Sequence, residues 1–98
     1  MNEYPALRQL IKAYFDEDWS EESGGDPRAV LTMFAVNEPD LAPRLRAEID
    51  ALLSKGEGEA AAVVRSLGPY YDVEGDGLSY AAWLMDVRQE VTRVLDHG

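Results

Sequence analysis

The chain has 98 residues, of which 46% are hydrophobic, and this is enough for one compact domain with a single core but too little for two. Nineteen acidic against nine basic side chains leave a net charge of −10, which argues against nucleic acid or an anionic membrane as a direct partner and favours a basic protein surface. The absence of cysteine excludes a disulfide framework, a thiolate nucleophile and a thiolate metal site.

The first expected helix begins at about Pro5, because proline is accepted in a first helical turn. Apolar residues then recur at spacings of three and four, which places them on one face of a helix. They are Leu7, Leu10, Ile11, Tyr14 and Phe15. This spacing predicts an amphipathic helix that ends close to Phe15.

An acidic segment follows this helix, with no Lys or Arg between Lys12 and Arg28. Its six carboxylates are Asp16, Glu17, Asp18, Glu21, Glu22 and Asp26. Like charges held together in a small domain repel one another, so the sequence tolerates a cost that scattered placement would avoid. Such a run is most often a solvated surface, but the large net negative charge favours contact with a basic partner.

Two helices are expected after this segment. Asp26 can cap the first, with Pro27 as its first residue, and the second follows a turn at residues 37–40, with Pro43 in its first turn and Gly56 as its terminator. Their apolar faces are Val30, Leu31, Phe34 and Ala35 in the first and Leu41, Leu45, Ile49, Leu52 and Leu53 in the second.

Two further helices complete the chain. One covers about residues 59–67 and ends at Gly68-Pro69, and the last begins at Ser79, a suitable N-cap, after a loop at 69–78. Their apolar faces are Ala60, Val63, Val64 and Leu67, and then Tyr80, Trp83, Leu84, Val87, Val91, Val94 and Leu95. No stretch alternates as a strand would. We therefore expect an all-α fold, a single domain over residues 1–98 built as a small bundle of about five helices.

Side chains suited to catalysis are few. His97, the only histidine, lies beside the C-terminus, where a frayed and solvated side chain is expected. Residues 77–81 come close to a nucleophile elbow, but that motif needs a preceding strand and a fixed histidine, so helix capping explains Ser79 better. The glycine pairs lie among carboxylates rather than beside a Lys-Ser or Lys-Thr pair, so we interpret them as turns and not as a phosphate-binding loop. We expect neither catalysis nor a cofactor.

Residues 72–77 (Asp-Val-Glu-Gly-Asp-Gly) reproduce the opening of an EF-hand calcium loop, including the glycine at the sixth position. The twelfth position, however, is Trp83 instead of the bidentate glutamate that such a loop requires. We interpret the segment as a polar turn whose acids precede a helix N-terminus, where the helix dipole favours them. No metal site is expected.

The aromatic residues divide into two groups. Phe15, Phe34 and Trp83 fit the apolar faces and are assigned to the core. Trp19, Tyr70 and Tyr71 lie outside those faces and beside acids, which makes them candidates for partly exposed anchors of an interface.

No feature indicates export or membrane insertion. The first residues, Met1-Asn2-Glu3-Tyr4-Pro5, lack a basic region followed by an apolar run. No apolar segment approaches the roughly 20 residues that cross a bilayer, and a chain without cysteine suits a reducing compartment. We therefore expect a soluble cytoplasmic protein with no membrane partner.

Several strings, in their order and spacing, resemble the immunity proteins of bacterial contact-dependent growth inhibition systems. They are Tyr4-Pro5-Ala6-Leu7-Arg8-Gln9-Leu10, Tyr14-Phe15 with Asp18-Trp19, Leu45-Arg46-Ala47-Glu48-Ile49-Asp50-Ala51-Leu52-Leu53, Leu67-Gly68-Pro69-Tyr70-Tyr71, Gly77-Leu78-Ser79 and Trp83-Leu84. The resemblance covers nearly the whole chain. It implies a small helical protein that binds the C-terminal toxin domain of a contact-dependent growth inhibition effector and protects the producing cell by binding alone.

Toxins of this kind are commonly nucleases with cationic clefts, so the resemblance and the charge agree on a basic partner. The matching strings look chiefly like scaffold, and the contact residues are therefore predicted from charge and exposure. We expect the toxin to contact the acids Asp16, Glu17, Asp18, Glu21 and Glu22, extended by Asp72, Glu74 and Asp76, with Trp19 or Tyr71 as an apolar anchor.

Two other functions stay open at this point. An acidic adaptor or nucleic-acid mimic that inhibits an endogenous basic nucleic-acid-binding protein would share the same electrostatics and differ only in its partner. A carboxylate-bridged metal hydrolase would need inward-facing acids such as Glu48 and Asp50 on facing helices. Both of these residues instead lie off the leucine face of their expected helix.

Overall fold

The computed structural model describes residues 4–69, 73, 75 and 77–97, and the main regular elements in these ranges are helical. In chain order they are α1 (Pro5–Gln9), the π-helix η1 (Leu10–Tyr14), α2 (Trp19–Ser23), α3 (Pro27–Asn37), α4 (Leu41–Ser54), α5 (Glu57–Leu67) and α6 (Tyr80–His97). The all-α prediction is confirmed.

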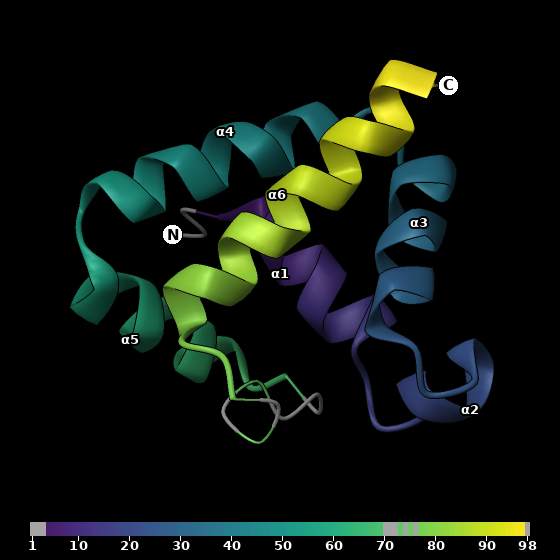
Figure 1. The fold of residues 1–98 in the computed structure, drawn as a ribbon, viewed down its shortest axis with the longest axis horizontal. Helices are drawn as coiled ribbons and strands as arrows, with labels where there is room; N and C mark the ends of the chain where they lie inside the picture. The colour runs from purple at the N-terminus through teal and green to yellow at the C-terminus, as the bar shows by residue number, and fades with distance from the viewer. Residues whose placement is uncertain (1–3, 70–72, 74, 76, 98) are drawn as a thin grey trace.

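Helix α6 is the longest element and crosses the middle of the molecule (Figure 1). It packs against α3, α4 and α5, while α1 packs against α4. In Figure 1, α3 and α2 lie on the right of α6, and α4 and α5 lie on its left and upper side. The acidic segment and the leucine-rich helices therefore occupy different sides of the bundle.

The core collects the apolar faces of these helices. Its largest fully buried side chains include Phe15, Phe34, Leu7, Leu10, Leu45, Ile49, Leu52, Leu84 and Val87. Phe15 and Phe34 are completely buried and Trp83 is 2% exposed, so the assignment of these three aromatics to the core is confirmed. Within the described residues no polar or charged residue is fully buried, which makes the core a purely apolar one.

The first helix departs from the expected continuous α-helix. It changes at Leu10 into a single π turn, closed by a hydrogen bond from the Phe15 backbone N–H to the Leu10 carbonyl oxygen at 3.0 Å. A π turn is wider than an α turn, so residues five apart come to nearly the same side. Leu10 and Phe15 are both fully buried as a result.

The N-terminus of α1 is capped by a side chain from α4. The two carboxylate oxygens of Glu48 accept hydrogen bonds from the backbone N–H groups of Ala6 and Leu7, each at 3.0 Å. These N–H groups lack partners inside the helix, and a carboxylate is favoured at the positive end of the helix dipole. Glu48 therefore ties α1 to α4 from a position off the leucine face.

Several predicted helix ends are confirmed. Asp26 caps α3 by accepting a hydrogen bond from the Arg28 N–H at 3.0 Å, and Ser79 caps α6 through the Ala82 N–H at 3.1 Å. Gly68, with φ of 69°, ends α5 in the left-handed conformation. Gly56, with φ of 101°, lies directly after Lys55, the C-cap residue of α4, as expected for its terminator, and it is also the N-cap residue of α5.

Helix α2 is not among the predicted helices, since its five residues (Trp-Ser-Glu-Glu-Ser) contain one apolar side chain and cannot show periodicity. A turn leads into it, closed by a hydrogen bond from the Asp18 N–H to Oδ1 of Asp16 at 3.2 Å. Gly24 and Gly25 follow it with φ of 70° and 82°, a left-handed conformation that glycine adopts freely. These two glycines reverse the chain into α3. In the described ranges, no helix combines the length and apolarity that crossing a membrane requires.

Candidate interaction surface

The negative charge of the molecule is concentrated in one third of the chain. Residues 13–43 contain eight carboxylates and a single basic side chain, Arg28, so they carry −7 of the net −10. The remaining residues share −3. Residues 13–43 form the end of η1, the turn into α2, α2 itself, α3, the link to α4 and residues 41–43 at the start of α4, which places this charge on one side of the bundle.

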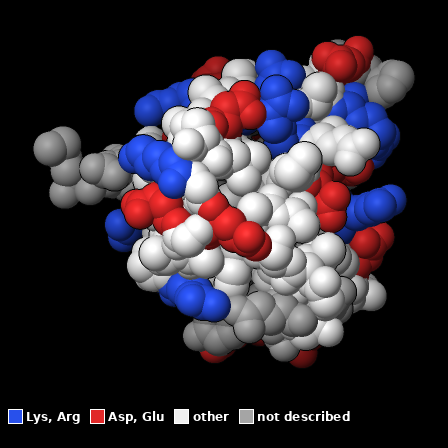
Figure 2. All heavy atoms as spheres, turned by 60° about the vertical axis from the view of Figure 1, so that its left-hand side comes forward, with Lys and Arg blue, Asp and Glu red and all other residues white. Residues whose placement is uncertain are grey.

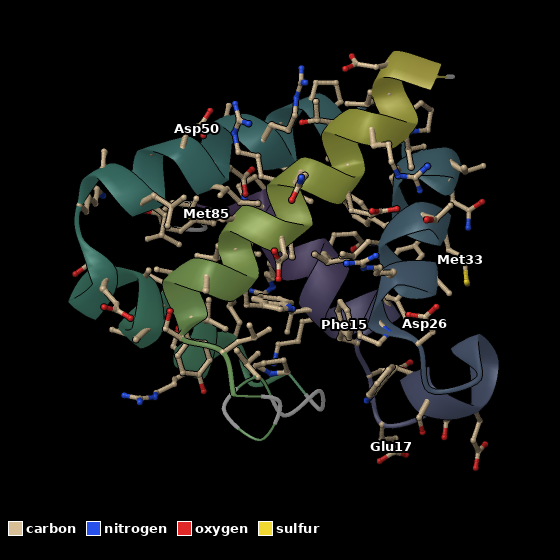
Figure 3. The ribbon with its side chains drawn as sticks, viewed as in Figure 1. Phe15, Glu17, Asp26, Met33, Asp50 and Met85 are labelled. Carbon is tan, nitrogen blue, oxygen red and sulfur yellow. The ribbon has the colours of Figure 1, made fainter. Side chains whose placement is uncertain are left out.

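The predicted acidic contacts are only partly brought together. Glu17, Asp18 and Glu21 are exposed around the start of α2, and Figure 3 shows Glu17 pointing away from the bundle. Asp16 is half-buried, and its carboxylate shapes the turn through the Asp18 N–H. The side chain of Glu22, together with Tyr71, Asp72, Glu74 and Asp76, lies outside the described residues, as does Tyr70. Their role in contact stays a prediction.

Trp19 is half-buried and leans on the core. Its ring lies 5.7 Å from that of Phe15 between centroids, and Phe15 in turn meets the ring of Trp83 edge-on at 5.8 Å. Trp19 is thus the outermost of three rings that lead from the surface into the centre of the bundle. Much of the apolar area that an anchor would offer to a partner is already used for packing.

The outer side of α3 carries exposed apolar side chains that are not among the contact residues predicted from the sequence. Met33 is 37% exposed and Val36 is 64% exposed, whereas Val30, Leu31, Phe34 and Ala35 on the same helix are buried. Figure 3 shows Met33 pointing away from α6, on the side of the molecule that also holds Asp26. A signal was present in the sequence, because both residues fall off the predicted apolar face of this helix.

We call the surface formed by the exposed side chains of Glu17, Asp18, Glu21, Asp26, Met33 and Val36 the α2–α3 surface. At the far end of α3, Glu38 is half-buried and accepts a hydrogen bond from the Tyr14 hydroxyl at 3.4 Å. Burial raises the pKa of Tyr14, a hydrogen bond with Asn37 lowers it, and the charge of Glu38 raises it again. Tyr14 therefore stays protonated and keeps donating to Glu38.

The side of the molecule built from α4, α5 and α6 has a different character. Figure 2 shows Lys and Arg interspersed with Asp and Glu there, rather than one sign alone. An example is Arg88 of α6, whose Nε lies 2.6 Å from Oδ1 of Asp50 on α4. The exposed Met85 lies close to this pair, since all three line one shallow depression between α4 and α6. Positive and negative charges largely compensate each other on this side.

A hollow of about 390 Å³ lies between α3 and α6, with Leu31 and Trp83 in its apolar wall. Positive and negative side chains lie side by side in its lining. Arg93 donates hydrogen bonds to Glu90, and Arg28 lies near the same carboxylate. The hydrogen bond from Arg93 is the main reason that the pKa of Glu90 is lowered, with attraction from Arg93 and Arg28 adding to it. Arg28, the one cation of residues 13–43, is thus directed towards α6.

Glu48 and Asp50, the acids that a metal hydrolase would need, serve separate partners. Glu48 caps α1 and Asp50 pairs with Arg88. Across the part of the chain that the structure describes, no three His, Cys, Asp or Glu side chains are grouped so that they could hold a metal ion.

Comparison of the sequence with protein-family models finds a match that covers most of the chain. Residues 3–91 match the family model described as CdiI immunity protein. No curated protein and no solved structure matches the chain.

Proposed function

The chain belongs to the CdiI immunity protein family, whose members neutralise toxins, and we propose that it binds a cationic nuclease domain at the C-terminus of a contact-dependent growth inhibition effector. It acts in the cytoplasm by binding alone and occludes the cleft that receives the phosphates of the substrate. The family match favours this function over an acidic adaptor of an endogenous protein.

The observation that carries the proposal is the charge of −7 on residues 13–43. A nuclease must attract a polyanion, so its substrate cleft is lined with Lys and Arg. An acidic protein surface is complementary to such a cleft, and opposite charges speed the encounter and disfavour wrong partners. The predicted acids Glu17, Asp18 and Glu21 are exposed and therefore accessible to such a cleft.

Co-expression tests the function. The chain is produced together with the C-terminal toxin domain encoded beside its own gene, and with toxin domains from unrelated effectors as controls. We expect the neighbouring toxin domain to co-purify with the chain and its toxicity to disappear, while the unrelated domains stay toxic. A neighbouring toxin that neither binds nor is neutralised would overturn the proposal.

A displacement measurement tests occlusion separately. A catalytically inactive form of the toxin domain is loaded with a fluorescent oligonucleotide, and the purified chain is added. Occlusion predicts release of the oligonucleotide in proportion to the complex formed. A ternary complex of toxin, oligonucleotide and chain would show instead that the chain inhibits from a site outside the cleft.

A further inference from the structure

The large exposed hydrophobic residues of the described ranges fall into two places. Of the large hydrophobic side chains, Met33, Val36 and Met85 stand out as exposed. Met33 and Val36 are three residues apart on α3, and side chains at this spacing are neighbours on a helix surface. Met85 lies on α6, on the side that faces α4 (Figure 3). Only the pair on α3 forms a stripe.

The stripe on α3 lies between acids. Asp26 caps the start of the helix and Asp40 follows its end, and both are exposed. Glu17, Asp18 and Glu21 lie around the adjoining α2, which packs against α3. Arg28 does not interrupt this arrangement, because it lines the hollow towards α6 beside Glu90. Met33 and Val36 are therefore an apolar centre within a border of negative charge.

We propose that Met33 and Val36 are the apolar centre of the toxin-binding surface, and that the acids of the α2–α3 surface form its rim. The proposal rests on the proposed function and replaces Trp19 as the anchor. Trp19 already packs on Phe15, whereas Met33 and Val36 expose 37% and 64% of their surface. The occupant is a basic protein domain that presents an apolar patch ringed by Lys or Arg.

Charge selects this occupant over a second copy of the chain. Two copies that met through the same surface would bring two segments of −7 against each other, and like charges across an interface are costly. A cationic toxin gains from the same contact. The Met85 site offers less selectivity, since Arg88 and Asp50 beside it compensate each other.

The division into centre and rim has kinetic consequences. Central apolar residues that lose water on binding contribute most to the lifetime of a complex, and methionine adapts its shape to the partner. Rim charges act mainly on the rate of association and on its dependence on salt. Removal of the centre should therefore speed dissociation without changing the salt response of association.

The experiment measures association and dissociation rates between the purified chain and a catalytically inactive form of the toxin domain that co-expression identifies. The central variant is Met33→Ser with Val36→Ser, and the control is Met85→Ser, a methionine outside the surface that is more exposed than Met33, at 60% against 37%. A second variant, Met33→Leu with Val36→Ile, keeps the apolar area. Thermal unfolding checks that all variants fold.

We expect the serine double variant to dissociate at least about tenfold faster, with the salt dependence of association unchanged. Met85→Ser and the leucine–isoleucine variant should stay within about twofold of the original chain. Equal affinity of the serine double variant, or an equal loss in Met85→Ser, would overturn the proposal. The proposal would also be overturned if the original chain were a dimer and the serine double variant were a monomer that binds toxin as well as the original chain does. That result would mean that the surface binds a second copy of the chain. If the original chain binds no toxin at all, the proposed function itself fails.

Discussion

The ring of Trp19 packs against the ring of Phe15, with 5.7 Å between their centroids and an angle of 57° between their planes. Phe15 is fully buried and Trp19 is half-buried, so the boundary between core and surface runs through the indole. The aromatic end of the first helix therefore supports folding, whereas Glu17 and Asp18, which follow shortly after it, face solvent.

Replacement of Trp19 by alanine should cost stability. The loss should be smaller than the about 3–5 kcal/mol typical of a fully buried aromatic, because part of the indole is exposed. Trp19→Phe should retain most of the stability by keeping a ring on Phe15. Urea unfolding gives the free energies. A variant that unfolds like the original chain but binds toxin poorly would show that Trp19 is an anchor after all.

Replacement of Glu48 by alanine should destabilise the bundle by about 1–3 kcal/mol, because two backbone N–H groups of α1 lose a charged acceptor. Asp50→Ala on the same helix is the matched control. It removes an exposed ion pair with Arg88 and should cost at most about 1 kcal/mol. Equal losses in the two variants, measured by urea unfolding, would contradict the capping role.

Neutralisation of Glu17, Asp18 and Glu21 to their amides should slow association with the toxin and flatten its salt dependence, because three exposed acids leave the rim. The control neutralises Glu57, Glu59 and Asp96, three exposed acids elsewhere. It changes the net charge equally and should have a smaller effect. Association rates measured over a range of salt concentrations compare the two. Similar effects would mean that total charge, rather than its location, governs the encounter.

Glu90 should make part of the stability dependent on pH. Its hydrogen bond from Arg93 lowers its pKa below the ordinary 4.5, so the folded state holds this proton less tightly than the unfolded state. The resulting stabilisation is present above the unfolded pKa and is lost as pH falls through the folded pKa. Glu90→Gln should therefore be less stable than the original chain at pH 7, and the difference should shrink below about pH 4. A difference that stays constant from pH 7 to pH 3 would contradict this.

Periodic features of this fold could be predicted from the sequence, and features that depend on tertiary contact could not. The faces of α3, α4 and α6 repeat often enough to identify the helices, and Asp26 and Ser79 are local capping signals. Helix α2 is too short to repeat. The capping role of Glu48 depends on a residue 42 positions away, which a local pattern cannot reveal.

The candidate surface shows the same division. Exposure of Glu17, Asp18 and Glu21 follows from their charge, and these expectations are confirmed. The structural use of Asp16 depends on the turn that its side chain closes. Met33 and Val36 were missed because an apolar residue off a helix face can still be covered by another part of the chain, and only the packed structure shows that nothing in the described residues covers them fully.

Helix α3 has a buried side and an exposed apolar side that lie opposite each other. Val30, Leu31 and Phe34 face the core, while Met33 and Val36 face outward. A substitution on the outer side changes what a partner meets without opening a cavity, and surface changes of this kind usually alter stability by no more than about 0.5 kcal/mol. Single substitutions on the exposed side of α3 can therefore change which partner the surface binds, while the fold of the bundle is kept.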